Sequence, residues 1–206
     1  MIPARLIRTV PKAPNVEVEQ FWNTARVLHP TWDLVTFRDP IDPVAFPITS
    51  PHWDRCTSGA QFAGLIRLEA LHHLGGCYID GDVELHQALD PLRTCSAFAA
   101  WEDERVVPDA VLGAEAGHPA IAACLDLALT RLYSESTDWH DGAGAWSTGP
   151  GVTTTILPGR TDVLLLPPQS FYPYPYTERH RRHEDHRAPF TFGAHHWAGS
   201  WLGGIV

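Results

Sequence analysis

The fold is decided by residues 65–83, which read LIRLEALHHLGGCYIDGDV. The first half has apolar residues on most sides of a helix, which ends at Leu74 because two glycines follow. An apolar run at 77–80 then predicts a short buried strand, and 83–85 continues extended after a glycine. A helix that leads straight into a buried strand is typical of α/β folds.

The same alternation extends outward to both ends of the chain. We expect strands at 2–10, 32–37, 96–101 and 163–166, and helices at 16–28, from Thr57 or Ser58 to Leu74, and at 118–133. Neither an internal repeat nor a linker divides the sequence. It therefore predicts an α/β sheet layered with helices, in one domain covering 1–206.

Composition excludes several classes of protein. The 206 residues carry a formal charge of -9, which argues against a nucleic-acid partner. No window approaches the roughly 20 apolar residues of a membrane span, and the first residues lack the apolar core of a signal peptide, so we expect a cytoplasmic protein. Cysteines do not occur as Cys-x-x-Cys, and Lys12 is the only lysine. Zinc ribbons, Schiff bases and P-loops are thereby disfavoured.

Asp80 and Asp82 leave the end of the strand at 77–80 around a glycine. In an extended chain, residues two apart point to the same face, here at the carboxyl edge of the sheet where α/β folds bind ligands. Two adjacent carboxylates repel each other unless a cation lies between them, so a divalent metal ion would explain the pair. The alternative is an ordinary solvated Asp-Gly-Asp turn.

Arg67 lies in the apolar helix with no carboxylate three or four residues away. A buried guanidinium is costly unless an anion meets it, and a phosphate or one of the two aspartates would serve. The alternative is an arginine that reaches solvent at the edge of the helix.

The block from Arg67 to Asp82, with its Gly-Gly before the strand and Asp-Gly-Asp after it, resembles glycosyltransferase family 32. This family contains DXD-motif sugar transferases, including fungal outer-chain mannosyltransferases and bacterial capsular-polysaccharide transferases. Weaker matches follow in the expected order over nearly the whole chain: Ile2-Pro3, Leu89-Asp-Pro-Leu92, Gly117-His-Pro119, Thr148-Gly-Pro-Gly151 and His195-His-Trp-Ala-Gly-Ser-Trp201.

The resemblance implies a GT-A-type, Rossmann-like mixed sheet flanked by helices. It also implies a UDP- or GDP-sugar donor, a Mn²⁺ or Mg²⁺ ion, and transfer with retention to a glycan or lipid-linked acceptor. Asp82 would ligate the metal directly, and Asp80 would contact it through water or contact the donor ribose and sugar. A C-terminal histidine often completes the metal shell in such enzymes, and the His-x-x-Gly199 spacing favours His196 over His195. An acceptor linked to lipid would place the protein at the periphery of a membrane.

The resemblance also implies further binding residues. Arg67 would contact the donor sugar or its phosphates, and Ser200 and Trp201 would close over the diphosphate. The remaining candidates are Thr9, Val10 and Gly81 for the donor and Trp146, Thr148 and Gly149 for the acceptor.

One position departs from the family pattern. An Asp usually stands three residues before the arginine and binds sugar hydroxyls, and here that position is Gly64. Either Glu102 or Asp103 substitutes for it, or the donor pocket differs. A non-catalytic module that binds a sugar or nucleotide is therefore the main alternative. A haloacid-dehalogenase-type phosphatase also has Asp-x-Asp after a strand, but its loop lies near the N-terminus and its downstream lysine is missing here.

Two aromatic or charged segments near the end are open to either interpretation. The segment 178–187 mixes both charge signs with three histidines and is expected to be a solvated loop, with an acceptor-facing or metal-scavenging role as the alternative. Tyr172, Tyr174 and Tyr176 alternate with prolines and could stack on sugars or pack over the sheet edge.

Overall fold

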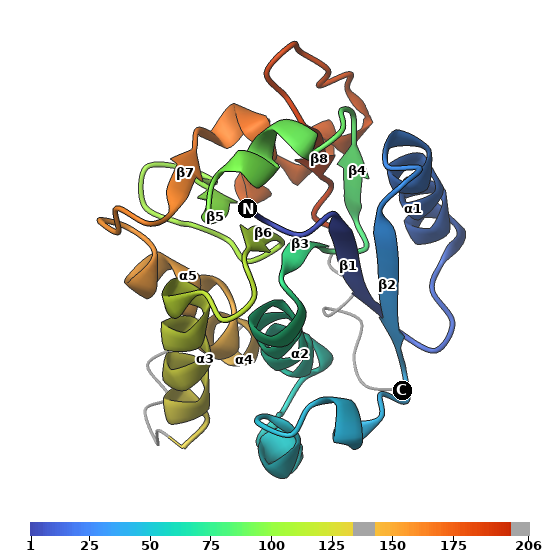
Figure 1. Cartoon of the computed structure of the whole chain (residues 1–206). Helices are drawn as coiled ribbons and strands as arrows, with labels where there is room; N and C mark the ends of the chain where they lie inside the picture. The colour runs from blue at the N-terminus through green and yellow to red at the C-terminus, as the bar shows by residue number, and fades with distance from the viewer. Residues whose placement is uncertain (134–142, 199–206) are drawn as a thin grey trace.

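The computed structural model describes residues 1–133 and 143–198 (Figure 1). Its main sheet has six strands in the order β2-β1-β3-β6-β5-β7. The strands β1, β2 and β3 run parallel, β6 is antiparallel to both β3 and β5, and β7 is parallel to β5. Their bounds are β1 Arg5–Val10, β2 Asp33–Arg38, β3 Gly76–Ile79, β5 Ala97–Ala100, β6 Val111–Ala114 and β7 Leu164–Leu166. The predicted α/β fold with a mixed sheet is confirmed.

A second, two-stranded sheet pairs β4 (Val83–Leu85) with β8 (Gly193–His195) in antiparallel register. Because Val83 lies opposite His195, this pairing brings the end of the described chain to the segment that follows β3.

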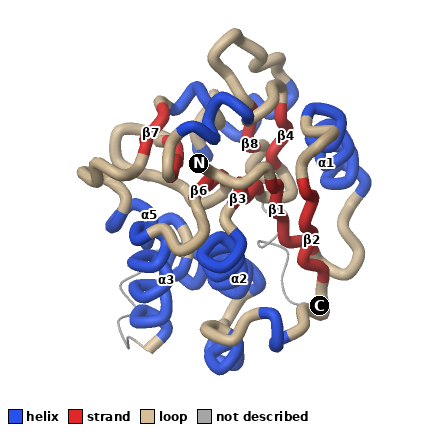
Figure 2. Tube along the Cα trace, in the orientation of Figure 1, coloured by secondary structure: helices blue, strands red, loops and turns tan. Residues whose placement is uncertain are grey.

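Helices cover the main sheet on two sides (Figures 1 and 2). Helix α2 packs against β1, β3 and β6, whereas α1 packs against β4. The helices are α1 Val16–Leu28, α2 Gly59–Leu74, α3 Pro119–Leu132, α4 Ala143–Thr148 and α5 Pro150–Ile156. Short 3₁₀ helices cover Pro43–Ala45, Ser50–Arg55, Asp90–Thr94, Pro168–Ser170 and Tyr176–His183, the last with a kink at Glu178.

Alternation along the strands divides the core between the two faces of the sheet. Ile7 and Tyr78 belong to one buried cluster, beside the apolar side chains of α2. Their neighbours Leu6, Cys77 and Ile79 belong to the other cluster, which includes Trp22 of α1. Each face of the central strands is thus fully covered, as the apolar runs in the sequence require.

The turn from α2 into β3 depends on its two glycines. Gly75 has φ 59° and Gly76 has φ 118°, a region that favours glycine. A Cβ atom on Gly76 would also lie 2.8 Å from the carbonyl oxygen of Arg5. This tight turn lets the helix deliver the chain directly into the central strand and sets the position of the residues after it.

Most predicted elements begin and end within a few residues of their observed bounds, and the cap residues Asn15 and Ser58 are as expected. The predictions lacked β6, α4, α5 and β8. No helix in the described part of the chain is long and apolar enough to cross a bilayer.

Candidate active site

Three chemically active side chains meet at the edge of the sheet: Asp80, Asp82 and His195. One ligand atom from each lies within 4.8 Å of the other two. Asp80 follows β3, Asp82 precedes β4, and His195 is the last residue of β8. Two carboxylates and an imidazole are ligands suited to a divalent cation.

The Asp82 carboxylate is held from two sides. One oxygen lies 3.1 Å from Nε2 of His195, and the other accepts a hydrogen bond of 2.8 Å from the backbone N–H of Ala198. Burial alone would raise the pKa of Asp82, but the charge and hydrogen bond of His195 lower it below its usual value. Burial alone would lower the pKa of His195, but Asp82 raises it. The two groups therefore favour the charged pair.

Trp197 links these residues by an unusual backbone conformation. Its φ of 51° lies in the left-handed region, which is uncommon for a bulky side chain. The Trp197 ring packs on His195 with centroids 4.1 Å apart, and its Nε1 donates to the carbonyl oxygen of Tyr174. The packing holds a strained turn that directs the Ala198 N–H at Asp82.

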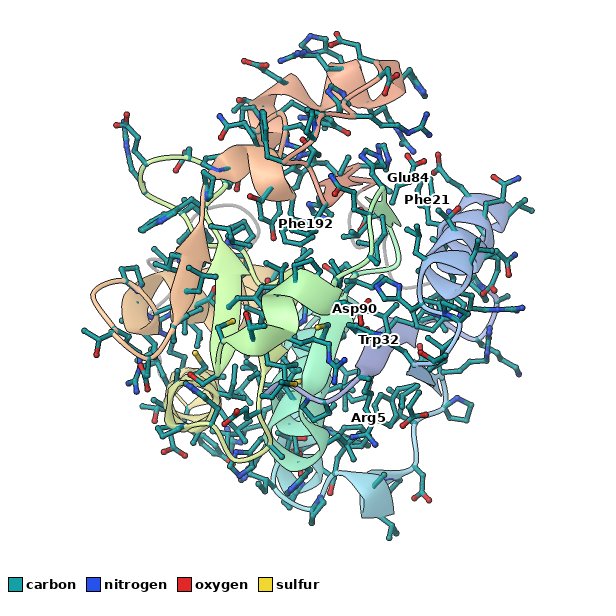
Figure 3. The ribbon with its side chains drawn as sticks, turned by 45° about the horizontal axis from the view of Figure 1, so that its top comes forward. Arg5, Phe21, Trp32, Glu84, Asp90 and Phe192 are labelled. Atoms are coloured by element: carbon teal, nitrogen blue, oxygen red, sulfur yellow. The ribbon has the colours of Figure 1, made fainter. Side chains whose placement is uncertain are left out.

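The preference for His196 as the metal ligand is corrected by this geometry. Consecutive residues of an extended strand point in opposite directions, so only His195 turns toward Asp82. The ring of His196 instead lies 3.1 Å from Glu84 and 3.1 Å from the hydroxyl of Tyr174, and it stacks on Phe21 of α1. Glu84 and Phe21, both labelled in Figure 3, thus hold the His196 ring from β4 and from α1.

Arg67 lies between two carboxylates and is almost completely buried, at 6% exposure. Its Nη2 donates to Asp80 over 2.8 Å, and its Nη1 lies 2.6 Å from Asp109. The guanidinium also lies over the ring of Tyr78, 4.7 Å from the centroid. Burial would lower its pKa, but Asp109 and Asp80 raise it well above the usual value. The predicted partner from the aspartate pair is confirmed as Asp80.

Asp109 is the site residue that sequence reasoning missed. It lies just before β6, and the antiparallel pairing of β6 with β3 places it beside Asp80, whose N–H donates to the carbonyl oxygen of Ala110. Burial raises the pKa of Asp109 to about 6 although Arg67 opposes the shift. The sequence did carry one signal for it. The apolar run VLGA at 111–114 is typical of a buried strand, and Asp109 lies just before it, at the end of a strand where ligand-binding residues can stand.

The chain is similar to known glycosyltransferases in sequence and in fold. No protein-family model matches the chain. Over 113 residues it is 31% identical to inositol phosphoceramide mannosyltransferase 2 of Schizosaccharomyces pombe, and is a distant homologue of that protein. The match covers 51% of this chain and 33% of the relative, so the chain spans about a third of the mannosyltransferase's length.

Solved structures show which fold the sheet belongs to. The PaToxG glycosyltransferase superimposes with a TM-score of 0.59 at 14% identity, covering 76% of this chain and 69% of that one. The chain has a GT-A glycosyltransferase-like fold. The galactosyltransferase LgtC, solved with donor and acceptor sugar analogues, covers 96% of this chain and 88% of its own at a TM-score of 0.48 and 10% identity.

Gly64 of this GT-A-like chain is explained by packing. A Cβ atom there would lie 2.8 Å from both the carbonyl oxygen and Oγ1 of Thr148, so α4 occupies the space that a side chain would need. Neither Glu102 nor Asp103 reaches Arg67: Glu102 accepts a hydrogen bond from the N–H of Tyr176, and the exposed Asp103 accepts those of the turn at 105–106. The second carboxylate at Arg67 is Asp109, a residue not named from the sequence, and the role of Glu102 or Asp103 in binding sugar hydroxyls stays a prediction.

Thr9 is connected to the site through a chain of hydroxyl groups. Its Oγ1 lies 2.7 Å from the hydroxyl of Tyr78, which donates to Asp80 over 2.8 Å. Val10 is buried, so that only its backbone could face a ligand. Gly81 lies against Val18 of α1, where an added Cβ would be 3.0 Å away. The candidate donor residues at the first strand and the Asp-Gly-Asp turn thus share one edge of the sheet.

The three candidate acceptor residues differ in exposure and in their contacts. Trp146 is 36% exposed and could meet a ligand. Thr148 is fully buried and its hydroxyl donates to the carbonyl oxygen of Gln61, which removes this side chain from the acceptor candidates. Gly149 lies against Asp109, since a Cβ atom there would be 2.8 Å from the carboxylate. Ser200 and Trp201 lie outside the described residues.

The tyrosines near the end of the chain pack more than they face solvent. Tyr172 and Tyr174 are both 1% exposed, and the ring of Tyr172 meets His195 edge-on at 5.8 Å. Packing is therefore the role that the geometry gives these two residues. The segment 178–187, predicted as a solvated loop, overlaps the 3₁₀ helix Tyr176–His183, which has no buried residue.

Proposed function

We propose that this chain transfers a sugar from a nucleotide-sugar donor to a hydroxyl group with the help of a divalent metal ion. The observation that carries the proposal is the group Asp80, Asp82 and His195, set beside the buried Arg67 at one edge of a GT-A-like sheet. The homology to a mannosyltransferase supports the same class of reaction.

The residues present fit Mn²⁺ or Mg²⁺. Carboxylate oxygens are the ligands that such hard cations prefer, and an imidazole is acceptable to Mn²⁺. Asp80, Asp82 and His195 would hold the ion. When bound, it would neutralise the negative charge that grows on the departing nucleoside diphosphate.

The chain's own residues keep this arrangement in place before any ligand arrives. Arg67 and the Tyr78 hydroxyl both bind the same oxygen of Asp80, and Ala198 and His195 fix the two oxygens of Asp82. Such preorganised dipoles and charges need little rearrangement during the reaction, which lowers its barrier. Arg67 also contributes a positive charge close to the place proposed for the diphosphate.

For the finer details we propose a UDP- or GDP-hexose donor, a glycan or lipid-linked acceptor, and retention at the anomeric carbon. The relative is named for a mannose transfer to inositol phosphoceramide. GDP-mannose and inositol-containing acceptors are therefore the first compounds to screen. The anomeric configuration of the product, read by nuclear magnetic resonance, tests retention.

The experiment is to incubate the protein with a panel of UDP- and GDP-sugars and candidate acceptors, with Mn²⁺ or with EDTA, and to measure released nucleoside diphosphate and glycosylated product. We expect metal-dependent release from one donor, lost in Asp82→Asn and retained in Asp126→Asn, at an exposed position of α3. Nucleotide binding without any release would instead support the non-catalytic binding module, to which Gly64 points.

A further inference from the structure

A cavity beside the proposed metal ligands is lined by basic side chains, although the chain as a whole is acidic. It has a volume of about 490 Å³ and is lined by Thr177, Arg179, His180, Arg182, Trp197 and Ala198. We propose that it is a phosphate-binding subsite, formed by the arginines of the 3₁₀ helix Tyr176–His183. The role of this subsite in catalysis rests on the proposed function, whereas its binding of phosphate can be tested independently of that function.

The lining contains two guanidinium groups, an imidazole and a hydroxyl, and it contains no carboxylate. One guanidinium group can donate two parallel hydrogen bonds to two oxygens of a phosphate, and threonine hydroxyls and backbone N–H groups complete such sites. In a chain with a formal charge of -9, a cavity wall of this composition is unusual. Its chemistry selects an anion rather than a neutral sugar.

The three arginines of the helix are used differently. Arg181 lies 2.8 Å from Glu178 and 3.0 Å from Glu184, and Arg182 donates to both oxygens of Glu17 on α1 at 2.7 and 2.6 Å. Arg179 has no carboxylate partner in the described part of the chain, and its guanidinium lies over the ring of Tyr176 at 4.8 Å. Arg179 is thus the positive charge that remains available for a ligand.

The cavity adjoins the proposed metal ligands through two of its own residues. The backbone N–H of Ala198 binds Asp82, and the Trp197 ring packs on His195. The turn between the cavity and Asp82 has Trp197 at a left-handed φ of 51°, and the hydrogen bonds of Trp197 to Tyr174 and of Ala198 to Asp82 hold it. A phosphate in the cavity would therefore lie next to a cation held by the aspartates.

Two sources could supply this phosphate: the diphosphate of the donor, or a phosphate carried by the acceptor. Asp80 and Asp82 would offset the charge of a bound divalent ion, and Asp80 and Asp109 already pair with Arg67, so a further guanidinium would stabilise the departing diphosphate. The experiment distinguishes the two sources.

The first arm measures calorimetric binding of pyrophosphate in EDTA to the wild type and to the variants Arg179→Ala and Arg181→Ala. We expect Arg179→Ala to weaken binding about tenfold, since a hydrogen bond to a charged group is lost. Arg181→Ala is the matched control, because it removes the same charge from the same helix but does not line the cavity. Equal binding by wild type and Arg179→Ala, equal losses in both variants, or no pyrophosphate binding by the wild type would overturn the proposal.

The second arm adds Mn²⁺ and compares UDP, GDP and inositol 1-phosphate. Weaker nucleotide binding in Arg179→Ala assigns the subsite to the donor, and weaker inositol 1-phosphate binding alone assigns it to the acceptor. The proposed function is tested separately, by whether Asp82→Asn loses the release of nucleoside diphosphate. If Asp82→Asn abolishes release while Arg179→Ala changes neither binding nor release, the function stands and the subsite is rejected.

Discussion

At the scale of single residues, Gly64 shows how packing accounts for a departure from a family pattern. Thr148 lies so close that a Cβ atom cannot be added without movement of α4. We expect Gly64→Ala to reduce the free energy of unfolding by about 1–3 kcal/mol, the usual cost of overpacking.

The matched control for this variant is Gly59→Ala in the same helix, where nothing lies within 4 Å of the added atom. That change should be neutral or should stabilise the protein by up to about 1 kcal/mol. Urea denaturation of both variants gives the comparison, and equal stabilities would show that the contact with Thr148 is not limiting.

Asp109 is the second residue-scale feature, because it holds the far side of the Arg67 guanidinium. We expect Asp109→Asn to lower turnover about tenfold or more, since Arg67 would lose its alignment. The free energy of unfolding should fall by about 1–3 kcal/mol, because the buried guanidinium of Arg67 loses one of its two charged partners. Asp126→Asn, at an exposed acidic residue of α3 outside this pair, should change neither quantity. Wild-type turnover in Asp109→Asn would refute a positioning role.

At the scale of elements, strand β8 presents one histidine to each side. His195 faces Asp82, whereas His196 faces Glu84 and Tyr174. We expect Mn²⁺ at a hundred times its dissociation constant to raise the melting temperature of the wild type by roughly 5–10 °C through binding to the folded state.

The variant His195→Asn should lose most of this shift. The variant His196→Asn should melt at a lower temperature, because its hydrogen bonds are gone, and yet should keep the Mn²⁺-dependent rise. A shift lost in His196→Asn and kept in His195→Asn would reverse the assignment.

His29 joins the end of α1 to the loop that precedes β5. Its Nδ1 lies 2.8 Å from the carbonyl oxygen of Ala25, and its Nε2 accepts a hydrogen bond of 2.8 Å from the N–H of Leu89, so the ring is neutral. Burial lowers the pKa of His29 below its usual 6.5. The neutral form therefore contributes stability that is fully present above pH 6.5 and is lost as the pH falls toward the lower pKa of the folded state.

For His29→Gln we expect a loss of about 1–2 kcal/mol at neutral pH. The difference between the two proteins should shrink between about pH 7 and pH 5, because the wild type must protonate a buried ring and the variant has none to protonate. Denaturation curves at several pH values measure it. A difference that is constant with pH, or that widens in acid, would contradict this account.

At the scale of the whole molecule, the sheet order explains why these residues meet. The strands β1 and β3 are parallel, so Thr9 and Asp80 come to one edge. Because β6 runs the other way beside β3, Asp109, two residues before the start of β6, reaches the same edge. The β4–β8 pair then adds His195 from the far end of the described chain.

This arrangement also separates what the sequence could predict from what it could not. The helix at 59–74, its Gly-Gly stop and the Asp-Gly-Asp turn follow from local patterns, and so do Arg67 and the two aspartates. Asp109 and the choice of His195 depend on strand pairings between distant segments, which no local pattern records. The strands β6 and β8 are short and contain glycine, so their own periodicity is weak.

The central claim is that Asp80, Asp82 and His195 bind a metal ion that in turn binds a nucleotide. The most direct test is a calorimetric titration of UDP and GDP, each with and without Mn²⁺, into the wild type and into Asp82→Asn. We predict that one nucleotide binds only when Mn²⁺ is present and that Asp82→Asn does not bind it. Binding of neither nucleotide in the presence of Mn²⁺, or undiminished binding by Asp82→Asn, would contradict the claim.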